Sequence, residues 1–542
     1  MTALRHAFEL RYLPLTLAVL GAVLFGLVGL ASGSAQVEVL ALLCVMVAAV
    51  GAHDLTQTRH AILRNYPIAA RLRFLLEKVR PEIRQYFFEA DKDGAPFPRD
   101  TRAIVYQRAK GVLDKRPFGT QYDVYQEGYE WLHHSLMPSQ TPDLDTLRVQ
   151  IGRTGEGRQP YSASVLNISA MSYGALSANA VRALNKGAKL GGFAHDTGEG
   201  GVSPYHREMG GDLIWEVGSG YFGCRTPDGR FDPDRFAATA RDPQIRMVEL
   251  KLSQGAKPGH GGVLPAAKVT AEIAAIRGVP QGQDCLSPAA HSSFSTPIGL
   301  LEMVARMREL SGGKPAGFKL CIGHGWEFMA ICKAMLETGI TPDFIVVDGK
   351  EGGTGAAPLE FMDHLGMPLR DGLSFVHNAL VGVGLRDSIR VGASGKIISA
   401  FDMARVLALG ADWCNVARGF MFAIGCIQAQ SCHTGLCPTG VTSPDPLRQR
   451  GLVVPDKAER VHNFHRNTLH ALAELLAAAG LSHPSDLRPH HLLRRGPDER
   501  AISYADHYRP LAPGQLLADP AGDARFAEAW RVSRADSFAR FG

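Results

Sequence analysis

Between residues 165 and 417, short apolar runs alternate with amphipathic segments, and this alternation limits the possible folds of the chain more than any other feature. Continuous apolar runs of this length are typical of parallel strands buried on both faces. The amphipathic segments between them suit the helices of β/α units. Eight such units predict an α/β fold with a (β/α)8 TIM barrel. The expected strands are Val165–Ala170, Gly192–His195, Met247–Leu252, Asp284–Pro288, Gly317–Ile322, Phe344–Asp348, Ile389–Ala393 and Trp413–Ala417.

The intervals between these runs contain the expected helices and one insertion. The stretch Val202–Arg246 is rich in Gly, Pro and Asp, and we expect it to be inserted between the second and third strands and to cover the barrel mouth. After the barrel, a helix is expected from Asp456 to Ala479, where Gly480 ends it. These patterns divide the chain into a hairpin (1–55), a basic, mainly helical connector (56–150), the barrel (151–455) and a C-terminal helical extension with a polar tail (456–542). The helices expected in the barrel are Ala178–Leu190, Ala267–Arg277, Ile298–Leu310, Trp326–Thr338 and Ala400–Leu409.

The first part of the chain contains two apolar segments. Leu13–Ala31 carries no charge, and its nineteen residues at ~1.5 Å each nearly cross a ~30 Å hydrocarbon core. A shorter run, Val39–Ala52, follows at once, so we expect a hairpin of two transmembrane helices. A cleaved signal peptide is the alternative, because Ala31–Ala35 resembles a small-residue cleavage site. The first run, however, exceeds the roughly 7–15 apolar residues of a signal peptide.

Basic residues flank this hairpin on both sides. Arg5 and Arg11 precede the first helix, a basic stretch begins at Arg59, and the turn Ser32–Gln36 has no Lys or Arg. The positive-inside rule therefore predicts an inner (cytoplasmic) membrane protein with its catalytic domain in the cytoplasm. The six cysteines outside the 426–437 segment are scattered among mostly apolar neighbours, as expected of free thiols in a reducing compartment.

The connector is the most basic part of the chain. Residues 59–116 hold fourteen Lys or Arg and seven acidic residues, an excess of +7 where the whole chain has +5. This charge suits either contact with anionic lipid or a solvated helical connector, and a helix is expected from Ile68 to Ala90. Nothing here resembles a nucleic-acid-binding module, so no nucleic-acid partner is expected.

Three of the nine cysteines lie within twelve residues. Cys426, Cys432 and Cys437 have a C-x5-C-x4-C spacing in a loop that contains Gly425, Gly435 and Pro438. Clustered thiolates suit a soft metal centre, and three of them suggest a 3Fe-4S cluster rather than 4Fe-4S. A structural zinc with His433 as fourth ligand is the alternative, although zinc ligands are usually paired at C-x2–4-C spacing.

Glycine-rich turns follow the expected strands at the end where a barrel holds its active site. Gly392–Lys396 and Ala417–Gly419 follow the last two strands, and their backbone N–H groups could cradle a phosphate. Gly198–Gly201, Gly255–Gly262 and Glu351–Pro358 would let backbone approach a planar ligand closely. Ordinary tight turns are the alternative for each. Nearby charges suit a substrate with amine and carboxylate groups: Glu199, Lys251 and Lys257.

Lys319 lies within the apolar run Gly317–Cys321, where an unpaired ammonium group would be strongly unfavourable. A flavin is one candidate partner, because a lysine beside its N1/C2 carbonyl edge stabilises the negative charge of the reduced ring. Asp348, at the end of the neighbouring strand, is the other candidate.

Five motifs, in this order, resemble the FMN-binding synthase domain of glutamate synthases. They are Ala170–Ser177 (AMSYGALS), Thr197–Gly201 (TGEGG), Gln254–Gly259 (QGAKPG), Gly352–Pro358 (GGTGAAP) and the cysteine loop. The resemblance spans about Val165 to Ala479, and the layout is similar to the short, membrane-anchored FMN-binding glutamate synthase family proteins.

This resemblance implies a barrel that holds FMN beside a 3Fe-4S cluster and aminates 2-oxoglutarate reductively through 2-iminoglutarate. It implies substrate contacts for Glu199, Lys251, Lys257 and Arg277. It implies cluster ligation by Cys426, Cys432 and Cys437. It implies FMN binding by Ser172, Lys319, Gly353, Thr354, Gly355, Ser394, Gly395, Arg418 and Gly419.

The sequence departs from the family pattern in three ways. Members that use glutamine carry a separate amidotransferase domain, whereas here Met1 leads into a membrane helix, so ammonia or an amine is the expected nitrogen source. His260 and Val263 stand where resembling sequences commonly have Glu and Gln, which removes an amide that would meet the oxo acid. No second G-x-G-x-x-G dinucleotide fold follows the barrel, so we expect an external electron donor such as ferredoxin or a separate reductase.

We therefore expect a membrane-anchored oxidoreductase acting on an amino acid/2-oxo acid C–N bond, with electrons passing between the donor and FMN through the cluster. An N-methylglutamate-synthase-like subunit that uses an amine is one alternative. A non-catalytic, membrane-bound electron-transfer subunit is an alternative of another class.

Overall fold

The computed structural model describes residues 9–541 and divides the chain into two compact units, Met1–Asp100 and Thr101–Gly542. The boundary falls inside the stretch that we expected to connect the hairpin and the barrel. Arg5, one of the basic residues used to orient the hairpin, lies outside the described residues.

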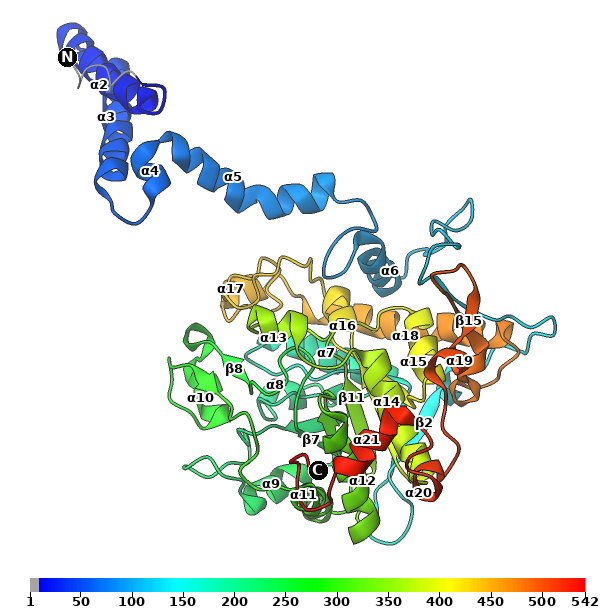
Figure 1. The fold of residues 1–542 in the computed structure, drawn as a ribbon. Helices are drawn as coiled ribbons and strands as arrows, with labels where there is room; N and C mark the ends of the chain where they lie inside the picture. The colour runs from blue at the N-terminus through cyan, green and yellow to red at the C-terminus, as the bar shows by residue number, and fades with distance from the viewer. Residues whose placement is uncertain (1–8, 542) are drawn as a thin grey trace. The chain divides into compact units, whose positions relative to one another are not determined.

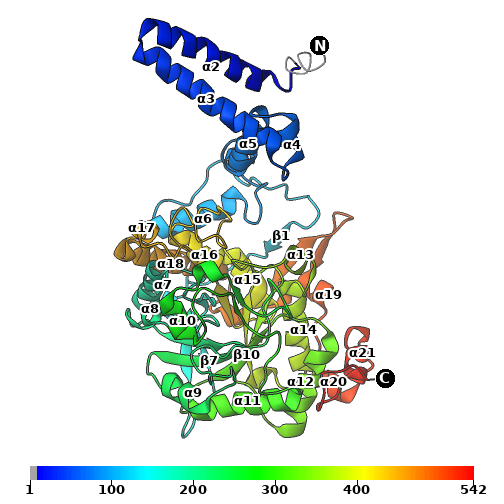
Figure 2. The same ribbon diagram turned by 90° about the vertical axis from the view of Figure 1, so that its left-hand side faces the viewer.

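The first unit begins with two long apolar helices, α2 (Leu13–Ser32) and α3 (Ala35–Thr56). They pack side by side, and Gly33 makes the turn between them in the left-handed region at φ 61° (Figure 2). Both are long and apolar enough to cross a membrane by length and composition. The helices α4 (Ala61–Asn65) and α5 (Ala69–Ile83) follow, and a π-helical turn (Arg84–Phe88) continues α5. Pro81 precedes this turn, where its missing N–H breaks the α-helical hydrogen-bond ladder.

The second unit is built on a closed barrel of eight parallel strands (Figure 1). In spatial order, closing from last to first, these are β4 (Leu166–Ile168), β5 (His195–Asp196), β6 (Leu213–Val217), β7 (Ile245–Lys251), β10 (Ala316–Leu320), β11 (Phe344–Asp348), β12 (Arg390–Ser394) and β13 (Trp413–Val416). All neighbouring pairs are parallel. The predicted (β/α)8 fold is confirmed.

Two of the predictions about the barrel strands are wrong. The third strand is β6, which lies inside the stretch Val202–Arg246 that we took for an insertion. Its five residues are all buried, but Glu216 interrupts the apolar run that would have revealed it. The expected strand Asp284–Pro288 is not in the barrel: β9 (Cys285–Leu286) pairs antiparallel with β8 (Val263–Leu264). The insertion therefore follows β7, between residues 252 and 296.

Helices cover the outside of the barrel largely where the sequence predicted them. Helices α7, α11, α12, α15 and α18 match the predicted segments to within about two residues. Figures 1 and 2 show α18 beside α7, and Gly187 lets the two helices approach, because a Cβ there would collide with Val461. The helices of this unit up to α18 are α6 (Arg99–Lys110), α7 (Ala178–Gly191), α8 (Pro204–Arg207), α9 (Pro233–Ala240), α10 (Ala271–Arg277), α11 (Pro297–Leu310), α12 (Gly325–Thr338), α13 (Leu359–His364), α14 (Leu369–Gly382), α15 (Ala400–Ala408), α16 (Arg418–Ala423), α17 (Pro446–Gln449) and α18 (Val454–Ala478).

A hairpin of β2 (Arg148–Ile151) and β3 (Tyr161–Ser164) closes the amino-terminal end of the barrel. Its side chains Ile151 and Tyr161 share one buried cluster with Phe344 and Trp413, the first residues of their strands. The apolar core therefore fills this end of the barrel, and the polar side chains are left to the carboxyl end.

The C-terminal region returns to the first residues of this unit. β14 (Leu492–Arg495) lies between β1 (Glu130–Leu132) and β15 (Ala501–Ser503) in an antiparallel sheet. Glu130 on β1 forms ion pairs with Arg370 and Arg405, so this sheet is fixed to α14 and α15. The last helices are α19 (Tyr504–Tyr508), α20 (Gln515–Ala518) and α21 (Ala524–Val532), and α21 packs against α12.

Candidate active site and cysteine loop

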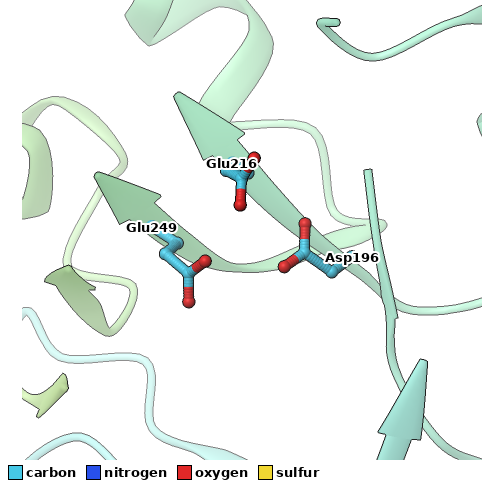
Figure 3. Close-up of side chains that lie close together, drawn as sticks. All are labelled: Asp196, Glu216 and Glu249. Atoms are coloured by element: carbon cyan, nitrogen blue, oxygen red, sulfur yellow. The ribbon is translucent and has the colours of Figure 1, made fainter. Parts of the chain in front are cut away.

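The barrel interior becomes charged toward the carboxyl ends of its strands. Asp196 on β5, Glu216 on β6 and Glu249 on β7 are fully or almost fully buried, and each offers a carboxylate oxygen within 4.8 Å of the others. Figure 3 shows the three side chains converging from neighbouring strands. Burial of three carboxylates requires cations or protons to balance their charge.

Lys319 on β10 supplies a cation to this cluster. Its ammonium group forms ion pairs with Glu216 and with Glu249, the latter at 3.3 Å between Nζ and Oε1. The alternative that paired Lys319 with Asp348 is wrong, because the ion pairs that Lys319 makes within residues 9–541 are with Glu216 and Glu249. Asp348 Oδ2 instead accepts a hydrogen bond from the backbone N–H of Gly255 at 2.8 Å. An ammonium group thus already sits among the three carboxylates, at a place where such a set could otherwise hold a metal ion.

The pKa values of two of these carboxyl groups are raised in spite of the nearby lysines. Burial, together with the charges of Asp196 and Asp348, raises the pKa of Glu249 well above its usual range. Burial also raises the pKa of Asp196, against the opposing effect of Lys319. Glu249 therefore keeps its proton to a higher pH than an exposed glutamate does, because two carboxylates sharing a site do not both ionise easily.

A cavity beside this cluster brings together three of the residues predicted to face the substrate. Glu199, Lys251 and Lys257 line it, with Gln254 and Ser219. Lys251 Nζ lies 3.2 Å from Glu199 Oε2, donates to Gln254 Oε1 at 2.8 Å, and lies 4.0 Å from Glu216 Oε1. Lys251 thereby links the cavity to the buried carboxylates.

The charges in the cavity shift one another's pKa values. Burial would raise the pKa of Glu199, but Lys251, Arg277 and Lys257 hold it below its usual value. Burial lowers the pKa of Lys257 to about 8, although Glu199 opposes this shift. At neutral pH the cavity therefore presents an ionised carboxylate between two lysines, and the Lys257 ammonium loses its proton at mildly alkaline pH.

Arg277, the fourth predicted substrate residue, is not among the residues that line this cavity. Its guanidinium donates to Ser172 Oγ at 3.3 Å and to the carbonyl of Tyr173 at 3.2 Å, and it lies over the ring of Phe222. The structure thus places it against Ser172, a predicted FMN-binding residue. Val263, one of the departures from the family pattern, pairs with Leu286 in the β8–β9 hairpin and does not line the cavity either.

The remaining predicted FMN-binding residues form two groups. Arg418 donates to the carbonyl of Thr354 at 3.2 Å and lies against Gly353, which unites the 353–355 turn with the turn after β13. Ser394 ends β12, and its hydroxyl lies 3.4 Å from that of Ser169. Gly395 follows with φ 149°, in the region that favours glycine. Gly419 packs against Val416 and Phe464, so it is needed for close contact between α16 and α18.

The three loop cysteines line one small cavity together. Cys432 lies beside the 353–355 turn, because a Cβ added at Gly355 would be 3.7 Å from its Cβ. The hydroxyl of Tyr106 on α6 donates to the carbonyl of Cys426 at 2.7 Å, and Lys268 Nζ donates to the carbonyl of Cys432 at 3.4 Å. His433, the fourth ligand of the zinc alternative, is exposed and does not line this cavity.

The thiols of the loop differ in their tendency to ionise. Burial raises the pKa of Cys426. Burial acts in the same direction on Cys437, but hydrogen bonds from Thr439 and Thr442 hold its pKa below the usual value. The loop thus already contains hydrogen-bond donors that stabilise a thiolate, the form that binds a metal.

Sequence reasoning did not single out Asp196, Glu216 and Glu249. The signal was the one that identified Lys319: a charged residue inside a buried apolar strand, as in Met247–Lys251. In Leu213–Val217 this signal could be used only after the segment was recognised as a strand.

Comparisons with known proteins identify the family of this chain. A family model described as the conserved region in glutamate synthase matches residues 120–482. The glutamate synthase large subunit-like protein YerD of Bacillus subtilis is 37% identical over 506 residues, which are 86% of this chain and 96% of that protein. The archaeal glutamate synthase [NADPH] of Methanocaldococcus jannaschii is 36% identical over 330 residues, 61% of each chain.

Solved structures with a partial likeness include a flavocytochrome b2 double mutant with pyruvate bound, at TM-score 0.40 and 12% identity over 84% of this chain and 91% of that one. A mandelate oxidase mutant with a monooxide FMN adduct has TM-score 0.38 and 14% identity, over 78% of this chain and 98% of that one. The barrel assignment rests on this chain's own strand order. The family match covers well over half of the chain, and this protein belongs to the glutamate synthase family.

Proposed function

We propose that this protein is an FMN- and 3Fe-4S-dependent oxidoreductase that forms a C–N bond by reductive amination of 2-oxoglutarate or a related 2-oxo acid. The reaction consumes the oxo acid, ammonia, two electrons and two protons, and yields the amino acid and water. One observation carries the proposal: Glu199, Lys251 and Lys257 line one cavity, and Lys251 also reaches the buried cluster around Lys319.

The residues at the carboxyl end of the barrel fit a flavin. Asp196 Oδ2 is buried and has no hydrogen-bond partner within residues 9–541, so an N–H group of a bound ring would satisfy it. Lys319 provides a buried cation, and Ser394, Gly395 and Arg418 provide polar groups in the turns where barrels often bind phosphate. When bound, FMN would supply the hydride chemistry.

The cysteine loop fits an iron–sulfur cluster with three protein ligands. Its cavity is lined by all three thiols and otherwise mostly by apolar groups, and three ligands suit 3Fe-4S better than 4Fe-4S. Gly355 lies beside Cys432, and the neighbouring Thr354 accepts a hydrogen bond from Arg418. The two expected cofactor sites would therefore be adjacent, on either side of the 353–355 turn. Such a cluster would supply one-electron transfer from an external donor.

The side chains of this chain bind and orient the substrate. Lys251 and Lys257, which line the cavity, would bind carboxylate groups of a 2-oxo diacid. The ionised Glu199 would hold a protonated nitrogen, and Gly218 and Gly262 leave room for its side chain, because a Cβ at either position would collide with it. The raised pKa of Glu249, beside Lys319, limits the negative charge of the buried cluster.

The proposal includes membrane anchorage through α2 and α3, with the barrel in the cytoplasm. A cytoplasmic donor such as ferredoxin or a separate reductase would then deliver electrons near the membrane surface. The other thiols of the second unit are buried and unpaired, as a reducing compartment would leave them.

Steady-state turnover of the full chain in detergent tests this function. We expect oxidation of a chemically reduced donor to depend on 2-oxoglutarate and ammonia and to yield glutamate, and Glu199→Gln to abolish it. Methylamine in place of ammonia tests the N-methylglutamate alternative, and glutamine tests amidotransfer. Reversible reduction of bound FMN without any turnover on these substrates would favour an electron-transfer subunit instead.

A further inference from the structure

The helix that follows the hairpin carries an exposed apolar face. On α5, five apolar side chains fall within an arc of about 100° when successive residues are separated by about 100°. Leu72, Leu75 and Leu76 are 60%, 55% and 54% exposed, far above the exposure of core leucines. The π-helical turn continues the apolar surface with two aromatic residues, Tyr86 and Phe87, of which Phe87 is 81% exposed. The complete face is Leu72, Leu75, Leu76, Val79, Ile83, Tyr86 and Phe87.

Basic residues border this face on both sides. By the same spacing, Arg73 and Arg80 lie along one edge, and Lys78 lies along the other with the acidic Glu82 beside it. Arg71 lies on the same side as Lys78, but its charge is balanced by Asp54. Glu77 lies on the polar side of the helix, where it pairs with Arg73 at 2.8 Å. An apolar stripe between two basic edges is the pattern of a helix that lies in a membrane interface rather than across the membrane.

An ion pair fixes the start of this helix at the end of the hairpin. Asp54, in the last turn of α3, is fully buried and binds Arg71 in a bidentate pair, with 2.6 Å between Nη2 and Oδ1. The same carboxylate accepts the backbone N–H of Ile68 at 3.0 Å. Ile68 has φ 66°, which reverses the chain there, and it packs against Gly51. The first turn of α5 therefore lies level with the last turn of α3.

We propose that the Leu72–Phe87 face of α5 lies in the headgroup region of a membrane that contains anionic phospholipids. The proposal rests on the membrane anchorage proposed above, because the Asp54–Arg71 pair places α5 where a membrane-spanning α3 would leave the bilayer. The basic edges favour anionic lipid over a second copy of this helix, since two copies would bring arginines and lysines together. The helix would thus bind the membrane surface along its length, in addition to the two helices that cross it.

Photocrosslinking of the full chain in lipid vesicles tests this proposal. Benzoylphenylalanine would replace Phe87 on the apolar face, Glu77 on the polar face as the matched control, or the exposed Leu24 of α2 as the anchor control. In vesicles of phosphatidylethanolamine and phosphatidylglycerol, positions 87 and 24 should attach to phospholipid, with about tenfold less attachment at position 77. Exchange of phosphatidylglycerol for phosphatidylcholine should lower attachment at position 87 and leave position 24 unchanged.

The outcomes separate this proposal from the anchorage on which it rests. Lipid attachment at position 24 with equal, low attachment at positions 87 and 77 would overturn the surface helix and leave the anchor intact. Protein dimers crosslinked through position 87 would instead make the face an interface between copies. Failure at all three positions would overturn the anchor and the surface helix together. Attachment at position 87 could also be equal in the two lipid mixtures and unchanged by Arg73→Gln with Arg80→Gln. That result would overturn the proposed preference for anionic lipid.

Discussion

The ammonium nitrogen of Lys319 on β10 lies 3.3 Å from Oε1 of Glu249 on the neighbouring strand β7, and it also contacts Glu216 on β6. This single cation ties three adjacent barrel strands together beside the cavity lined by Glu199, Lys251 and Lys257. Asp196 on β5 adds a third carboxylate to the cluster. The charge balance of the barrel interior therefore depends on Lys319, and this dependence is open to measurement.

Lys319→Met should destabilise the protein by about 3–5 kcal/mol, because it leaves buried carboxylates without their cation. In protein that still binds FMN, the flavin potential should fall, since the neutral side chain no longer stabilises the charge of the reduced ring. Denaturant unfolding and redox titration measure the two effects. The double variant with Glu216→Gln should recover part of the stability through the coupling of the pair. An unchanged potential with FMN bound would make Lys319 a structural ion-pair partner only.

Glu249→Gln should change how stability depends on pH. The pKa of Glu249 is raised in the folded state, so its contribution to the free energy of unfolding is fully present below the unfolded value of about 4.3 and is lost as pH rises through the folded pKa. The amide cannot ionise, so the variant should lose less stability than the native protein between pH 5 and pH 8. Glu302→Gln, on the exposed side of α11, is the control and should follow the native curve. Parallel curves for the native protein and Glu249→Gln would show that Glu249 is ionised throughout.

The barrel could be predicted from the sequence because most of its strands are apolar runs, and the prediction failed where a strand contains a buried charged residue. Glu216 hid β6, and the two apolar residues of Cys285–Leu286 imitated a strand between Asp284 and Pro288. Lys319 was recognisable as a buried cation from sequence, but its partners were not. Residues 196, 216, 249 and 319 meet only when the barrel closes with a definite register, which residue types alone do not specify.

Affinity for the 2-oxo acid should decrease above pH 8 through Lys257. Burial lowers the pKa of this lysine to about 8, so the ammonium that attracts a substrate carboxylate is lost as pH rises through that value. The KM for 2-oxoglutarate should rise by up to about tenfold per pH unit there. Lys257→Arg keeps its charge and should flatten the profile up to pH 10, whereas Lys257→Gln should raise KM at every pH. A native-like profile for Lys257→Arg would assign the titration to another group.

Cys432→Ser should remove the broad visible absorption of an iron–sulfur cluster while leaving the sharper flavin bands. The three loop thiols line one cavity, and loss of one of three protein ligands leaves too few to hold the cluster. Cys332→Ser is the matched control, because that thiol is equally free but buried within α12, and its spectrum should be native.

His433→Ala distinguishes iron from zinc at the same loop. The exposed His433 does not line the cavity, so a cluster held by Cys426, Cys432 and Cys437 should survive this substitution with its iron content unchanged. A zinc site with His433 as fourth ligand should instead lose most of its metal, because no histidine or carboxylate lines the cavity to replace the imidazole. Metal analysis of the purified full chain distinguishes the two sites. Zinc without iron in the native protein would contradict the cluster. Loss of metal in His433→Ala, together with native absorption in Cys432→Ser, would contradict it as well. Iron present in the native protein, retained in His433→Ala and lost in Cys432→Ser would locate the cluster on the three thiols, beside the turn that carries Gly355.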